Sequence, residues 1–238
     1  MKLYDTVIAE CQKLLVPYEK KVLSAGTTVW PDVGENNMIL KSEMAYELGG
    51  GNNVAGSGLC FTTDGSKLAQ DEILLYGPDL SEIKKDTPYG RLTLISVEPE
   101  LFSDANKAYS ALRKIEYTRY HTNPYGYMMR ISTASDREVV RIGKEALENG
   151  LDFAKVGQAF LTKYHDNNQV KAVRIIFITE PDFPYDALQK QMRKSEQITD
   201  SMDHIFKDLV MDCSVCNLKP VCDEVEGMRA LHFQVSKQ

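Results

Sequence analysis

The sequence predicts an α+β fold in which a mixed or antiparallel β-sheet is flanked by helices. Two observations predict this class: the expected strands form a group in the first half of the chain, and strands alternate with helices only in the second half. The 238 residues are 43% hydrophobic and 26% charged, which is ordinary for a globular protein with one body and a small appendage. We expect the body to span residues 1–205 and the appendage to span residues 206–238.

The first half is expected to contain one helix followed by strands. Apolar residues recur every three or four positions over residues 3–25, and Pro17 should bend or split this helix. Short β-prone runs bounded by turn residues predict strands at 44–48, 59–63, 72–76 and 91–97. The glycine-rich residues 49–58 predict a β-hairpin with a long, mobile tip. A phosphate-binding loop is disfavoured there, because a strand follows and no lysine comes after Gly56.

The second half is expected to alternate helices with strands. Ser135 and Glu138 have the spacing of a capping box, which predicts a helix that ends at Gly150. Residues 170–179 are β-branched and apolar on both faces, which is typical of a central strand. The other expected elements are a helix over 104–120, a strand over 127–131, a helix over 153–164 and a mostly polar helix over 185–204.

Charge and hydropathy exclude some classes of function. The chain has 28 basic and 34 acidic residues, and its net charge of -6 disfavours nucleic acid and anionic lipid as partners. The longest apolar run, around residues 173–178, is far shorter than the roughly 20 residues that a membrane-spanning helix needs. The N-terminus also lacks the pattern of a secretory signal. We therefore expect a cytoplasmic protein without membrane contact, whose partners are proteins or small molecules.

Cysteines cluster near the C-terminus and predict a small metal-binding loop. Cys213 and Cys216 are separated by two residues and Cys222 follows after five, so a tight loop gathers three thiolates. His232, ten residues further on, is the expected fourth ligand. Thiolates of this kind select zinc or an iron–sulfur cluster, and four ligands suit a tetrahedral zinc site or a [4Fe-4S] cubane.

The alternative is that these cysteines are ordinary core residues. Cysteine is often buried, and His232 between two apolar neighbours can be a packed side chain. The polar residues interleaved with the cysteines make a poor core segment, which favours the metal site. Cys11 and Cys60 each lie in an apolar pattern of their own, so we expect both to be core cysteines.

Five segments occur in a characteristic order along the chain: residues 44–50 (MAYELGG), residues 76–80 (YGPDL), residues 130–132 (RIS), the helix near 150–165 and the cysteine loop. Their order and spacing resemble the β subunit of carbon monoxide dehydrogenase/acetyl-CoA synthase. The resemblance covers roughly residues 37–232, which correspond to that enzyme's middle domain and the opening of its metal-bearing domain.

The resemblance implies that Cys213, Cys216 and Cys222 bind a [4Fe-4S] cluster, because in that family a Cys-x2-Cys loop opens the segment that holds the cluster. Two departures matter. The interval before Cys222 is shorter than in the family, and His232 stands where the family has a fourth cysteine. Histidine can replace cysteine on cluster iron and typically raises the reduction potential.

A larger departure concerns the nickel site. The family's nickel-binding Cys-Gly-Cys segment and its N-terminal dehydrogenase-docking domain are absent from this sequence, so we do not expect this chain alone to complete acetyl-CoA synthesis. Three hypotheses remain. The first is a stand-alone iron–sulfur protein for electron transfer or partner docking in anaerobic one-carbon or corrinoid metabolism.

The second hypothesis is a catalytic subunit, a CO-methylating acetyl-CoA synthase-type acyl or methyl transferase, whose partner supplies nickel or a corrinoid. A purely structural Cys3His zinc site is the third. The expected partner is a corrinoid protein, a methyltransferase or a dehydrogenase subunit.

Overall fold

The computed structural model describes residues 2–24, 26, 29–34, 40–51, 53–103, 105–132, 137–204, 216 and 218–225. Its larger sheet has five strands in the order β1-β4-β8-β5-β3. Their bounds are Lys21–Leu23 (β1), Ala55–Thr62 (β3), Glu72–Tyr76 (β4), Tyr89–Val97 (β5) and Val170–Ile178 (β8). β4 pairs with β8 and β3 with β5 in parallel, whereas β5 pairs with β8 and β1 with β4 in antiparallel fashion. The sheet is therefore mixed, as the sequence predicted.

A second, antiparallel sheet has the order β2-β7-β6. Its strands are Ala45–Leu48 (β2), Tyr127–Ser132 (β6) and Arg137–Gly143 (β7). β7, the middle strand of this sheet, also packs against β3, an edge strand of the larger sheet, so the two sheets are in contact. The predicted α+β class is confirmed by this pair of sheets and the helices around them.

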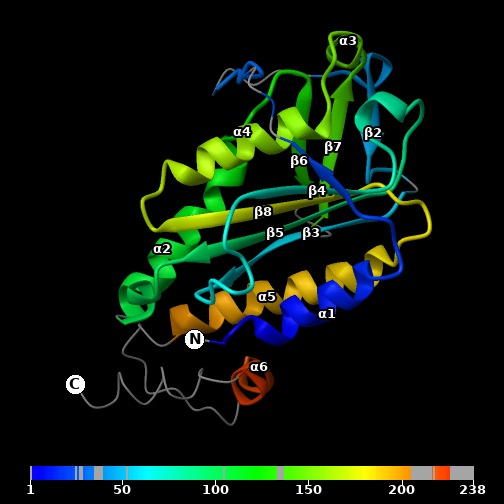
Figure 1. The fold of residues 1–238 in the computed structure, drawn as a ribbon. Helices are drawn as coiled ribbons and strands as arrows, with labels where there is room; N and C mark the ends of the chain where they lie inside the picture. Colours follow the sequence, from blue (N-terminus) through cyan, green and yellow to red (C-terminus); the bar gives the residue numbers. More distant parts are fainter. Residues whose placement is uncertain are drawn as a thin grey trace.

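Helices cover both faces of the larger sheet. Figure 1 shows α4 (Phe153–His165) on one face, and α1 (Asp5–Leu15) beside α5 (Tyr185–His204) on the other. This cover explains why β5 is buried along its whole length and β8 along most of its length. The remaining helices are α2 (Ala105–Tyr117), α3 (Lys144–Glu148), α6 (Lys219–Glu224) and the short 3-10 turns η1 (Ser42–Met44), η2 (Leu80–Glu82), η3 (Pro99–Ser103) and η4 (Thr118–His121).

Two glycines in β3 allow α5 to lie close to the sheet. A Cβ atom on Gly56 would come within 2.9 Å of the Tyr185 carbonyl oxygen. A Cβ atom on Gly58 would lie 2.8 Å from Cβ and Sδ of Met192. The glycine-rich segment is thus used for close packing of a helix on a strand.

The prediction of a β-hairpin over residues 49–58 is wrong. β2 and β3 belong to different sheets, and residues 55–58, expected at a mobile tip, are part of β3. Ala55 is fully buried. Glycine signals a turn correctly, but the strands on either side of this turn find partners elsewhere: β2 pairs with β7, and β3 pairs in parallel with β5.

The predicted helix that starts at the capping box is also wrong in its first half. Residues 137–143 form strand β7, and only Lys144–Glu148 are helical. Residues 133–136 lie outside the described part of the chain. Residues 138, 140 and 142 are buried and alternate with half-buried neighbours, and β2 and β6 pair with both edges of the strand. Sheet pairing on two sides therefore overrides the local helix-start signal.

The N-terminal helix is shorter than predicted. α1 ends at Leu15, two residues before Pro17, and residues 21–23 form edge strand β1. The strands predicted at 44–48, 72–76 and 170–179 and the helices at 153–164 and 185–204 are confirmed within one or two residues. Within the described ranges, every helix is too short or too polar to cross a membrane.

Candidate functional site

A buried ion pair joins the two sheets. Arg91 on β5 and Glu138 on β7 are each 2% exposed, and their Nη2 and Oε2 atoms are 2.7 Å apart. The Arg91 guanidinium also lies 4.2 Å from the centre of the Phe160 ring. Burial lowers the pKa of Arg91, but Glu138 and nearby tyrosines raise it more, so Arg91 stays charged. The attraction between the two charges offsets the hydration that both lose on folding.

Two tyrosines extend this buried polar layer. The hydroxyls of Tyr89 and Tyr127 share a hydrogen bond of 2.8 Å, and Tyr89 donates a longer one of 3.5 Å to Oε1 of Glu138. Burial raises the pKa of both tyrosines, which therefore stay neutral. The layer thus holds one fixed ion pair and two neutral hydroxyls.

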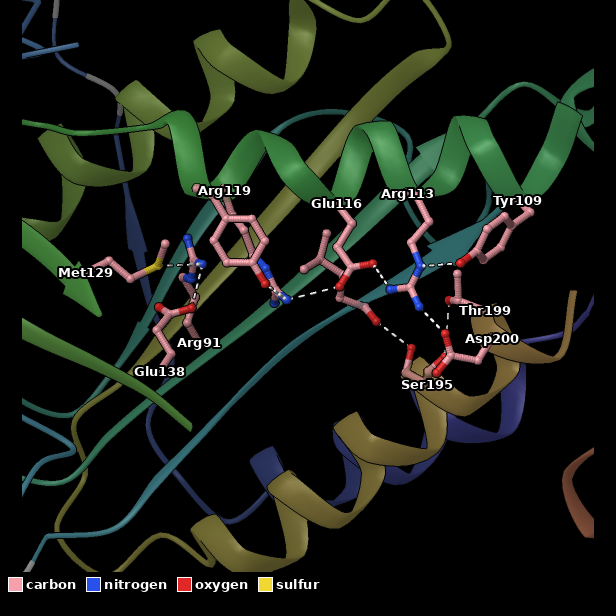
Figure 2. Close-up of polar contacts among 12 residues, drawn as sticks. Arg91, Tyr109, Arg113, Glu116, Arg119, Met129, Glu138, Ser195, Thr199 and Asp200 are labelled. Carbon is pink, nitrogen blue, oxygen red and sulfur yellow. Dashed lines mark hydrogen bonds and ion pairs between the residues drawn. The ribbon is translucent and has the colours of Figure 1, made fainter. Parts of the chain in front are cut away.

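A second charged group lies between α2 and α5, as Figure 2 shows. Glu116 accepts hydrogen bonds from Arg113 at 2.5 Å and from Arg119 at 3.0 Å. Arg113 also pairs with Asp200 of α5, and Arg119 donates to the Tyr120 hydroxyl at 2.6 Å. The Arg113–Asp200 pair links α2 to α5, and the other contacts hold the side chains of α2 and η4 in place.

A polar cavity of about 110 Å³ lies between this charged group, β3 and α5. Its lining includes Arg119, Glu116, Glu138 and Glu196, with Met192 on the apolar side. Burial raises the pKa of Glu196, and the nearby carboxylates of Glu116 and Asp200 raise it further. The cavity can therefore hold a few waters or one small polar molecule beside a carboxyl group that retains its proton above the usual range for glutamate.

The structure places two of the four predicted metal ligands. Cys216 precedes α6 and its carbonyl oxygen accepts a hydrogen bond of 3.2 Å from the Lys219 amide. Cys222 lies within α6, is half-buried and packs against the main core. Cys213 and His232 lie outside the described residues. Among the residues that are described, no group of three or more His, Cys, Asp or Glu side chains is placed to hold a metal ion.

Helix α6 is attached to α5 by a few contacts. Val221 and Val225 are buried, and Glu224 pairs with Lys194 of α5 at 2.7 Å. In Figure 1, α6 lies beside α5, away from the sheet. The helix that carries Cys222 is therefore docked on the outside of the body.

Cys11 and Cys60 are core residues, as predicted. They are 1% and 0% exposed, and burial raises the pKa of Cys60 to about 12. Both thiols therefore stay protonated and are poor metal ligands.

A protein-family model described as the CO dehydrogenase/acetyl-CoA synthase complex beta subunit matches residues 31–183. The chain belongs to this family. It is therefore an acetyl-CoA synthase-like protein related to carbon monoxide dehydrogenase, and the predicted resemblance is confirmed. No curated protein matches the chain. The family's name refers to one subunit of a complex, which favours a protein partner.

The family match covers the buried layer but ends before α5 and α6. Arg91 and Glu138 lie within the matched range, whereas Cys216 and Cys222 lie beyond it. Sequence reasoning missed Arg91 and Glu138 as a pair. A usable signal existed, because Arg91 is the single charged residue of the strand at 89–97 and needs a counter-charge if that strand is buried. Only the fold identifies Glu138 as that partner.

Proposed function

We propose that this protein is an acetyl-CoA synthase-like iron–sulfur protein that serves electron transfer or partner docking in anaerobic one-carbon or corrinoid metabolism. The family match over residues 31–183 carries the proposal. The three cysteines at 213, 216 and 222 support it, because clustered thiolates are the usual ligands of iron–sulfur clusters. In this proposal residues 1–205 form the body, and residues 206–238 hold the cluster.

The thiolates of Cys213, Cys216 and Cys222 would hold three corners of a [4Fe-4S] cluster, and His232 would hold the fourth. The cluster would supply one-electron redox chemistry. Cys222 is half-buried against the core on α6, which suits a ligand that must be shielded from water but stay near the surface. In the cytoplasm its cysteines would remain reduced and available to iron.

Two alternatives are favoured by particular observations. The family name refers to a complex, which favours a catalytic subunit whose partner supplies nickel or a corrinoid. The docking of α6 on α5 through Val221 and Val225 favours a Cys3His zinc site that only anchors the C-terminus.

Metal analysis of anaerobically purified protein tests the proposal. About four irons and four sulfides per chain, with broad absorbance near roughly 400 nm, are expected for a [4Fe-4S] protein. Cys213→Ser, Cys216→Ser and Cys222→Ser should each lose most of the metal, and Cys11→Ala is the matched control. A colourless protein with about one zinc per chain would instead support the structural site.

His232 needs its own comparison. His232→Cys should retain the cluster and lower its reduction potential, because a thiolate adds negative charge, whereas His232→Ala should lose iron. Anaerobic redox titration with electron paramagnetic resonance measures both. Equal potentials and equal iron content in all three proteins would remove His232 from the ligand set.

A further inference from the structure

A groove of about 640 Å³ runs between α5 and α6 on the outer side of α5. Lys190, Arg193 and Lys194 line it from α5, and Arg137 lines it from the start of β7. The three α5 residues recur at spacings of three and four positions, so they form one stripe along the helix. The carboxylates in the lining are Asp186 and Glu224. The groove is therefore positively charged, although the chain as a whole carries a net charge of -6.

Both carboxylates of the groove are exposed and already paired. Glu224 is 63% exposed and lies 2.7 Å from Nζ of Lys194. Asp186 is 80% exposed and lies 3.6 Å from Arg137. Exposed pairs of this kind are weak, so an incoming carboxylate can displace Glu224 from Lys194 or Asp186 from Arg137.

Lys190 is exposed and makes no ion pair with any residue that the structure describes. A solvated basic face is the ordinary explanation of such a stripe on a helix. Here, however, the stripe faces a second element across a groove, and α6 forms the opposite wall with Pro220, Val221 and Glu224. An occupant of the groove would therefore touch α5 and the helix that carries Cys222 at the same time.

We propose that this groove is the docking surface for an acidic segment of a partner protein, whose carboxylates pair with Lys190, Arg193 and Lys194. This inference rests on the proposed function, because it specifies the chemistry of the partner that docks. An incoming carboxylate takes over Lys194 from Glu224. This exchange removes one of the contacts that hold α6 on α5, so partner docking is linked to the position of Cys222.

Fluorescence anisotropy with a labelled glutamate-rich decapeptide tests the proposal on the full chain at low salt. Its glutamine analogue is the uncharged probe. Lys190→Glu and Arg193→Glu should each weaken binding roughly five- to tenfold, since each replaces an attraction by a repulsion. Glu224→Gln should tighten binding about twofold, because it removes the internal competitor. Affinity for the charged probe should fall steeply with added salt.

The matched controls are Lys114→Glu and Lys163→Glu, which change lysines in a separate open groove formed by α2 and α4. They should change affinity by less than about twofold, which is within the effect of net charge alone. Equal weakening by control and groove variants, or equal binding of the glutamine peptide, overturns the proposal.

The metal content of each variant separates this inference from the proposed function. Site-specific peptide binding by a protein without metal keeps the docking surface and rejects the iron–sulfur role. If the protein is loaded with metal and its affinity for the peptide is unchanged by Lys190→Glu and Arg193→Glu, the iron–sulfur role is kept and the docking surface is rejected.

Discussion

The body and the α6 segment are held in different ways. In the body, β8 lies at the centre of a sheet covered on both faces, and the Arg91–Glu138 pair joins this sheet to the second one. In contrast, α6 has six residues, and the contacts described for it are the buried Val221 and Val225, the half-buried Cys222 and the exposed Lys194–Glu224 ion pair. With fewer buried contacts, α6 is expected to open locally more readily than the body. The family match falls in the body.

The largest effect is expected from breaking the buried ion pair. Arg91→Met leaves the Glu138 carboxylate buried without its partner, which should lower the free energy of unfolding by roughly 3–5 kcal/mol. Arg91→Met combined with Glu138→Leu should recover much of this loss, because the uncompensated charge is gone. Urea denaturation of both variants measures the difference. A single variant as stable as the wild type would show that the pair does not hold the sheets together.

The next effect concerns the approach of α5 to β3. Gly58→Ala places a Cβ atom 2.8 Å from Met192 Cβ, near the root of that side chain, so the helix must shift. Overpacking of this kind costs about 1–3 kcal/mol. Gly65→Ala is the matched control, since nothing lies within 4 Å of its new Cβ atom. Equal denaturation midpoints for the two variants would contradict the proposed close contact.

A smaller and local effect is expected at α6. Val221→Ala should weaken the docking of α6 by about 1.5 kcal/mol, roughly tenfold in the docking equilibrium. Amide hydrogen exchange over residues 219–225 should therefore become faster, while the unfolding midpoint of the body stays unchanged. Val22→Ala, at a valine that is 65% exposed, is the control. A lowered global midpoint would mean that α6 belongs to the cooperative body.

Local sequence signals predicted those elements whose tertiary contacts favour the same secondary structure. The apolar run over residues 170–179 predicted β8, and the three- to four-residue periodicity that begins at residue 3 predicted α1. Strand β7 could not be predicted, because its helix-start signal is local whereas its partners β2 and β6 are contributed by other parts of the chain. The Arg91–Glu138 pair is hidden for the same reason, since its members are 47 residues apart. The cysteine cluster stays a prediction from spacing, because Cys213 and His232 lie outside the described residues.

The smallest effect is a pH dependence at Glu196, which lines the cavity in the body. Burial and the carboxylates of Glu116 and Asp200 raise the pKa of Glu196. The folded protein therefore binds this proton more tightly than the unfolded chain does. Its contribution to stability is fully present below the ordinary pKa of glutamate and is lost as pH rises through the raised pKa.

Glu196→Gln should remove this loss, so that the variant is more stable than the wild type at pH values above the raised pKa of Glu196. The gain should be roughly 0.2–1 kcal/mol, because solvent screens the exposed part of the side chain. The two proteins should converge at lower pH. Glu224→Gln is a control of opposite sign, because Lys194 lowers the pKa of Glu224 and its stabilisation is lost as pH falls. Unfolding midpoints measured from about pH 4 to pH 8 decide the matter, since ordinary glutamates titrate at the lower end of that range. If the unfolding midpoints of Glu196→Gln and the wild type differ by the same amount at every pH, Glu196 does not bind a proton in this range. The polar cavity is then only a pocket for water.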